Sequence, residues 1–146
     1  YNLAVGGLPG AERLGFEPTY YGETLGPEFL TWVRQRSLQG PVELHFPLGL
    51  LNIIILRDWG IFPPGVQVAN LGEATHPVHV LPRNKGVYAP LDWWLERHGH
   101  PIFAIPRQGV DLLRVYPFEE LAEATEATRD QPGALRSSPR PTWSFP

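Results

Sequence analysis

The 146-residue chain contains no cysteine and no methionine. The absence of cysteine excludes disulfides, thiol nucleophiles, thiolate zinc sites and iron–sulfur clusters within this segment. The sequence begins with Tyr1 and not with methionine, and its first residues do not form the basic region followed by an apolar stretch that is typical of a signal peptide. We therefore interpret the sequence as a piece of a longer protein.

Long apolar runs and positive charge are also scarce. The best apolar run, Leu48–Leu56, is interrupted by Asn52 and is shorter than the roughly 18 residues of a membrane span. The formal net charge is −3 and the sequence pI is about 5.9. Because binding to a phosphate backbone needs a basic surface, we do not expect nucleic acid as a partner. We expect the segment itself to be soluble.

The sequence does have the composition of one globular domain, with 42% hydrophobic and 12% aromatic residues. A folded chain of this length buries enough surface to be stable without disulfides or metals. Its 15 glycines and 17 prolines indicate many turns between short elements.

The chain divides into three parts. Residues 1–26 are rich in glycine, proline and tyrosine and lack periodicity, which predicts an extended lead-in with turns. Residues 27–128 carry periodic apolar patterns and should form the domain. Residues 129–146 are dominated by proline, serine and arginine, which predicts a disordered tail.

Turn and cap residues bound the elements that we expect in the domain, with proline opening helices and glycine ending them. The expected helices are 27–38, 48–59, 90–98 and 118–128, and the expected strands are 42–46, 66–69, 78–81, 102–105 and 112–116. The 48–59 segment could also be a buried strand, but its apolar residues repeat at helical spacing. In the last helix, Phe118, Leu121 and Ala122 should face inward. Strands that alternate with helices, followed by a closing hairpin, predict a small three-layer α/β domain with a partly parallel sheet.

Histidine pairs are the first candidate chemistry. His76 and His79 are three residues apart, but Pro77 lies between them, and the other close pair spans Gly99. Neither pair can occupy a regular helical face, so we favour turn histidines over a metal site. We expect no metal and no cofactor. His45, on an expected strand, should be a partly buried core residue.

Two further kinds of site find little support. The glycines of 6–10 lack the strand–loop–helix context and the lysine of a phosphate-binding loop. No glycine-x-serine-x-glycine pattern occurs, which argues against a serine hydrolase.

Aromatic and acidic residues form the remaining candidate site. Glu17 and Glu23 bracket Tyr20 and Tyr21. Paired carboxylates perform acid–base chemistry on sugars and aromatic faces stack on sugar rings, so this cluster could contact a carbohydrate. The alternative is that the tyrosines pack the lead-in onto the domain while the glutamates are solvated.

Trp93 and Trp94 are adjacent, so one should face the core while the other could lie at an interface with another domain or a membrane surface. We take Trp93 as a candidate binding residue beside the acidic and tyrosine cluster. No residue is assigned a catalytic role.

The lead-in carries a more specific pattern. It contains Tyr1-Asn2, Gly6-Gly7, Gly10-Ala11, Glu17 and Tyr20-Tyr21. This string resembles the segment that follows the last membrane helix in bacterial integral-membrane glycosyltransferases of the dolichyl-phosphate-mannose protein mannosyltransferase type, relatives of the aminoarabinose transferases of lipid A. Residues 56–60 followed by Pro63 are also similar to that soluble region, and the resemblance extends to about residue 123.

The resemblance implies hexosyl transfer from a polyprenyl-phosphate sugar on the non-cytoplasmic face of a membrane. The family's catalytic acidic residue lies in an early loop between membrane helices, so its catalytic residues are expected outside this segment. The segment would be a C-terminal extracytoplasmic, periplasmic accessory domain. Its partners would be the membrane-embedded portion of the same polypeptide and a glycan or lipid-linked sugar.

Two alternatives stay open. One is a freestanding carbohydrate- or protein-binding module with the tyrosine and tryptophan pairs as contacts. The other is a small hydrolase that uses Glu17 and Glu23.

Overall fold

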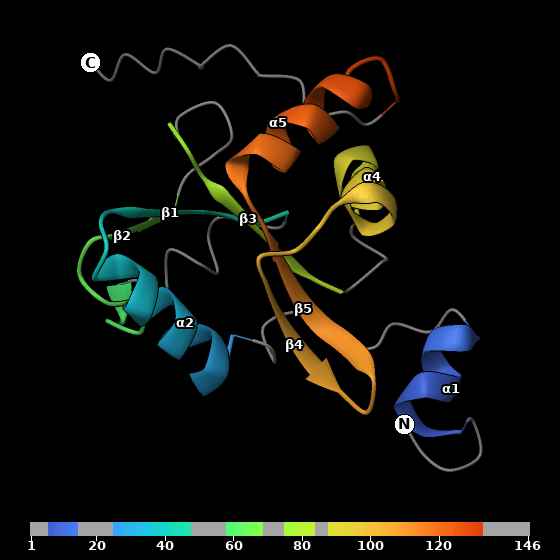
Figure 1. Cartoon of the computed structure of the whole chain (residues 1–146), viewed down its shortest axis with the longest axis horizontal. Helices are drawn as coiled ribbons and strands as arrows, with labels where there is room; N and C mark the ends of the chain where they lie inside the picture. Colours follow the sequence, from blue (N-terminus) through green and yellow to red (C-terminus); the bar gives the residue numbers. More distant parts are fainter. Residues whose placement is uncertain (1–5, 15–24, 48–57, 69–74, 84–87, 133–146) are drawn as a thin grey trace, which may run out of the picture.

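The computed structural model describes residues 6–14, 25–47, 58–68, 75–83 and 88–132. Within them, a five-stranded sheet carries helices on both faces (Figure 1). The described elements are, in chain order, α1 (Gly7–Arg13), α2 (Pro27–Ser37), β1 (Val42–His45), β2 (Val66–Val68), β3 (Val78–Pro82), α4 (Pro90–His98), β4 (Phe103–Arg107), β5 (Val110–Tyr116) and α5 (Phe118–Ala127). This architecture confirms the small α/β domain that the sequence predicts.

The sheet is mixed and has the strand order β2-β1-β3-β5-β4. β1 pairs in parallel with both β2 and β3, while β5 pairs in antiparallel fashion with β3 and β4. The closing hairpin turns at Gln108 and Gly109, where φ is +50° and +78°. Two-residue hairpin turns require this left-handed backbone because it matches the twist of the flanking strands.

One face of the sheet forms an apolar core against α2. Side chains alternate along each strand, so every second residue of β1, β3 and β5 points to this face. There they meet Phe29 and Val33 of α2, which lie one helical turn apart and are both fully buried. The strand residues in this cluster include Val42, Leu44, Val78, Val80, Leu113 and Val115.

The other face of the sheet packs against α4 and α5. Its apolar cluster combines Leu81 of β3 and Tyr116 of β5 with Leu91, Leu95, Leu121 and Ala124 of the two helices. Polar residues of the same strands also lie on this face, among them His45, His79 and Arg114, and the two histidines are buried. The two faces of one sheet therefore differ in chemistry.

Most expected elements are confirmed to within a few residues, including the helix that opens at Pro90 and ends before Gly99. The lead-in is not extended throughout, because residues Gly7–Arg13 form α1. In α5, Ala122 is exposed, and Ala124 is the alanine that faces the core. Most of the expected 48–59 helix and of the 129–146 tail lies outside the described residues.

Within the part of the chain that the structure describes, no helix combines the length and the apolar character needed to cross a bilayer.

Candidate functional site

Of the residues that the sequence singles out for binding, the structure describes Trp93. Glu17, Tyr20, Tyr21 and Glu23 lie outside the described residues. The Trp93 side chain projects from α4 and is 37% exposed. Its ring meets that of Tyr88 edge to face, with 5.1 Å between the ring centroids.

Trp94, the neighbour of Trp93, packs against the apolar cluster between the sheet and the two helices. The prediction that one of the two tryptophans faces the core is therefore confirmed, whereas the role of the other at an interface stays a prediction. The exposed Trp93 ring and the half-buried Tyr88 ring, which packs against the same cluster, lie together beside the start of α4.

The polar face of the sheet brings together side chains that the sequence analysis did not connect. His79 of β3 and Arg83, which directly follows β3, point to this face, and α4 directs Asp92 and Glu96 back toward them. A spacing of four keeps two residues on one face of either a strand or a helix, which is why these residues meet as two pairs. The pairs are His79 with Asp92 and Arg83 with Glu96.

The first pair belongs to a buried hydrogen-bond chain that crosses three elements. His45 of β1 and His79 of β3 are register partners, and their Nδ1 atoms lie 2.7 Å apart. The His79 Nε2 atom lies 2.7 Å from Oδ1 of Asp92. The backbone N–H of Ala89 donates to Oδ2 of the same carboxylate at 2.7 Å. His79 and Asp92 are both fully buried.

His79 corrects one interpretation from the sequence. It is not a turn histidine, because it lies on the strand β3. It is also not brought together with His76, whose ring packs edge to face against Phe118. His45 is the core residue that we expected, and it is more deeply buried than expected, with 6% of its surface exposed.

The hydrogen bonds constrain where the protons lie. The Asp92 carboxylate accepts, so His79 carries a proton on Nε2, and only one of the two facing Nδ1 atoms can carry another. Burial, and then the neighbouring His79, lower the pKa of His45 to about 3. The His45 ring is therefore neutral over the physiological pH range.

The contact between the two rings is a hydrogen bond rather than a shared metal site. Two nitrogens that bind one zinc ion tetrahedrally at about 2.05 Å would be roughly 3.3 Å apart, which exceeds the Nδ1–Nδ1 separation. Among the described residues, no group of three or more histidines, aspartates and glutamates has an arrangement that could hold a metal ion.

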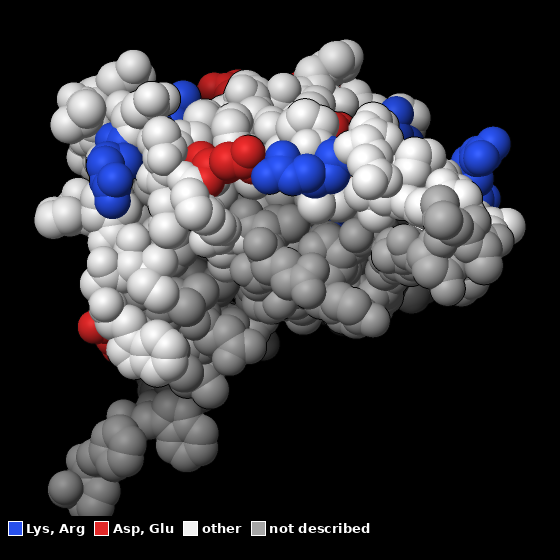
Figure 2. Space-filling view, turned by 90° about the horizontal axis from the view of Figure 1, so that it is seen from below, with Lys and Arg blue, Asp and Glu red and all other residues white. Residues whose placement is uncertain are grey.

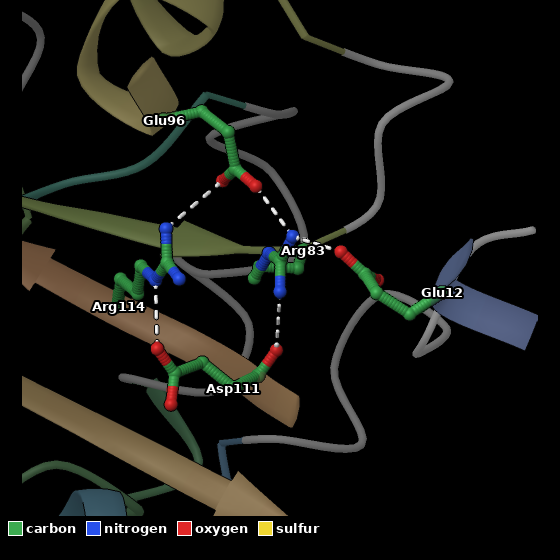
Figure 3. Close-up of polar contacts among 5 residues, drawn as sticks. All are labelled: Glu12, Arg83, Glu96, Asp111 and Arg114. Atoms are coloured by element: carbon green, nitrogen blue, oxygen red, sulfur yellow. Dashed lines mark hydrogen bonds and ion pairs between the residues drawn. The ribbon is translucent and has the colours of Figure 1, made fainter. Parts of the chain in front are cut away.

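The second pair belongs to an ion-pair network centred on Arg83, which we call the Arg83 network (Figure 3). The Arg83 Nη2 donates to the carboxylates of Glu12 and Glu96, and its Nη1 donates to the backbone carbonyl of Asp111 at 3.2 Å. Arg114 extends the network, since its Nε donates to Asp111 Oδ2 at 2.9 Å and its Nη1 lies 3.6 Å from Glu96. Residues far apart in the sequence thus converge on one guanidinium.

The Arg83 network keeps its charges despite burial. Burial favours neutral Arg83, yet the carboxylates of Glu96 and Glu12 outweigh it and raise the pKa of Arg83 above its ordinary value. Burial also raises the pKa of Tyr116, although the nearby Arg114 opposes the rise. The network therefore consists of a permanently charged arginine among carboxylates, which suits it to holding elements together.

Among the described residues on the face shown in Figure 2, the surface charges form no extended basic region. Arginine side chains there form separate patches, and one of them adjoins an acidic patch. Exposed charges also pair elsewhere, as between Arg107 and Glu28 at 2.6 Å.

Comparison with protein-family models, with curated protein sequences and with solved structures gives no match to this chain. The fold and its buried polar face define a small three-layer α/β domain. Its function must be inferred from the residues.

Proposed function

We propose that the chain is the C-terminal extracytoplasmic accessory domain of a membrane glycosyltransferase. The enzyme would move a sugar from a polyprenyl-phosphate donor, in the manner of the protein mannosyltransferases, with its catalytic residues in the membrane-embedded portion of the same polypeptide. The domain would lie on the periplasmic side. The lead-in string and its resemblance to the segment after the last membrane helix support this proposal.

The observation that carries the proposal is the ion pair between Glu12 and Arg83. Glu12 lies on α1, inside the lead-in string, and Arg83 directly follows β3 at the centre of the sheet. Only 6% of the Arg83 side chain and 23% of the Glu12 side chain are exposed, and Ala11 of α1 is fully buried. A lead-in that is anchored in this way would fix the orientation of the domain, whereas a flexible tether would not.

The test uses the full-length protein in membranes. The change Glu12→Gln removes the carboxylate charge from α1 while preserving its shape. If the anchored lead-in orients the domain over the active site, we expect sugar transfer from a polyprenyl-phosphate donor to fall several-fold, with equal amounts of protein in the membrane. The matched control is Glu126→Gln, since Glu126 pairs with Arg129 on the exposed surface of α5.

Three results would overturn the proposal. One is a parent reading frame with no array of apolar spans of roughly 20 residues before Tyr1. Another is turnover of a glycosyl donor by the purified 146 residues alone. The third is unchanged transfer by a full-length protein from which residues 27–132 are deleted.

The Tyr88 and Trp93 surface favours a second candidate, a carbohydrate-binding module. An exposed aromatic ring such as Trp93 is a suitable platform for a sugar ring, and the half-buried Tyr88 meets Trp93 edge to face and so holds it in place. Titration of the isolated chain with mannose-containing oligosaccharides would quench tryptophan fluorescence if this candidate is correct. Trp93→Ala should then abolish the response, while Trp59→Ala, at another exposed tryptophan, should preserve it.

A further inference from the structure

The pairing between β1 and β3 is the shortest ladder at the centre of the sheet. It has two register pairs, Leu44 with Val78 and His45 with His79, and we call these four residues the β1–β3 seam. By contrast, β3 and β5 are joined by four register pairs. One of the two pairs at the seam is therefore made of two histidines.

Hydrogen bonds of side chains reinforce this seam on the polar face. The two imidazole rings stack with their centroids 4.9 Å apart, and their Nδ1 atoms share a hydrogen bond. Asp92 then holds His79 from α4. The seam thus depends on a continuous chain from β1 through β3 to the first turn of α4.

The geometry limits how many protons this chain can hold. With neutral rings, His45 donates from Nδ1 to His79, which in turn donates from Nε2 to Asp92. One additional proton can be accommodated, because a doubly protonated His79 would donate to Asp92 and to His45 at once. A second additional proton would place hydrogens on both Nδ1 atoms, and two donors cannot remain 2.7 Å apart.

We propose that the His45–His79–Asp92 chain is an acid-sensitive lock on the β1–β3 seam, which opens when both histidines are protonated. Opening breaks the hydrogen bond between the rings and weakens the pairing of β1 with β3. The lock is independent of the membrane assignment, since it rests on contacts within the domain.

The other titratable groups near the lock do not take the place of the hydrogen bond between His79 and Asp92. Tyr116 of β5 is the register partner of His79, and its hydroxyl is neutral in acid, as a tyrosine with its ordinary pKa already is. On β1, Glu43 accepts the backbone N–H groups of Thr75 and His76, which precede β3. Among the described residues, Asp92 is therefore the carboxylate that bonds directly to the histidine pair.

The direction of the pH effect follows from the numbers of protons bound. In the unfolded chain, His45 has an ordinary pKa near 6.5, and in the folded chain its pKa is lowered to about 3. Between these values the unfolded state binds more protons, so stability falls as the pH falls from about 6.5 toward 3.

The test is urea unfolding of the chain at pH 7 and pH 5. For the wild-type protein, the His45 contribution alone should raise the unfolding equilibrium constant roughly 25-fold between these two values. In His45→Asn, the amide nitrogen can take the place of Nδ1 and donate to His79, but it does not titrate. We expect this variant to lose most of the 25-fold increase. His100→Asn is the control, because the His100 side chain is 91% exposed.

A second measurement observes the lock directly. Nitrogen-15 NMR of the imidazole rings between pH 7.5 and 4.5 should show His45 neutral for as long as the native spectrum persists. Protonation of both His45 and His79 in a chain with native signals would overturn the proposal. So would an unchanged pH dependence of unfolding in His45→Asn, and if that variant does not fold, the NMR titration of the wild-type protein decides.

Discussion

The two faces of the sheet are built from the same strands but are held in different ways. Toward α2, alternate strand residues form one apolar cluster around Phe29 and Val33. Toward α4 and α5, the same strands place His79, Arg83 and Arg114 beside a smaller apolar cluster. Apolar burial is non-directional, whereas hydrogen bonds and ion pairs require particular partners in particular geometry.

This difference indicates that the two faces of the sheet contribute differently to the fold. The apolar face supplies stability that depends on the volume and area buried and not on pH. The polar face specifies how α4 sits on the sheet, because His79 with Asp92 and Arg83 with Glu96 fix one position of the helix along β3. The same pairs make this face dependent on protonation and on intact partners.

The largest effect that we predict tests the apolar face. Phe29→Ala should destabilise the domain by about 4 kcal/mol, because a fully buried aromatic ring is replaced by a cavity. The ring packs against Phe46 and Phe62 with centroids 6.4 and 6.5 Å away. Urea unfolding should show this loss equally at pH 7 and at pH 5.

Leu38→Ala is the control for Phe29→Ala, since Leu38 follows α2 directly but is 84% exposed. Its unfolding free energy should change by no more than about 0.5 kcal/mol. A Phe29→Ala loss that grows strongly between pH 7 and pH 5 would contradict the distinction between the two faces.

The next effect tests the polar face. Arg83→Met should destabilise the domain by about 3 kcal/mol, because it removes the guanidinium from between Glu12 and Glu96 while keeping an apolar chain of similar length. The cost of Arg83→Met comes from the carboxylates that it leaves buried without their cation, so removing the charge of Glu96 should lower that cost. We expect Arg83→Met with Glu96→Gln to be less destabilised than the sum of the two single variants.

A double-mutant cycle measured by urea unfolding gives the coupling between Arg83 and Glu96. A coupling of about 1 kcal/mol or more would show that charge, rather than volume, determines the cost on this face. Strict additivity would instead mean that Arg83 acts through its packed hydrocarbon chain, and the contrast between the faces would fail.

Local signals made much of the fold predictable. Pro27 and Pro90 open helices where their fixed φ suits the first turn, and the position of Gly99 marked the end of α4. α1 was missed because Pro9 and Gly10 within its seven residues imitate a turn. Its helix is stabilised by packing, which local propensity does not report.

The polar face could not be assembled from the sequence because its contacts depend on strand register. His45 meets His79 across 34 positions, and Glu12 meets Arg83 across 71. A shift of one residue in the pairing of β1 with β3 would place the two imidazoles on opposite faces of the sheet. The spacing of four residues between His79 and Arg83, and between Asp92 and Glu96, was visible in the sequence. No local signal showed that β3 and α4 would be neighbours.

A smaller effect tests how closely α4 and β5 approach on the polar face. A Cβ added at Gly99 would lie 2.7 Å from Cε1 of Tyr116 and 2.8 Å from the carbonyl oxygen of Leu95. The backbone φ of Gly99 is −78°, so alanine would suffer from contact and not from backbone strain. We expect Gly99→Ala to cost about 2 kcal/mol, since a buried ring and a helix carbonyl must both move.

Gly65→Ala separates close contact from backbone strain. Gly65 has a φ of +87°, and a Cβ there would meet nothing within 4 Å, so strain alone should cost about 1 kcal/mol. Near-UV circular dichroism should change in Gly99→Ala, where Tyr116 is displaced, and should stay native in Gly65→Ala. If Gly99→Ala has native stability and a native near-UV spectrum, Tyr116 has room to move, and the polar face is packed less tightly than its hydrogen bonds indicate.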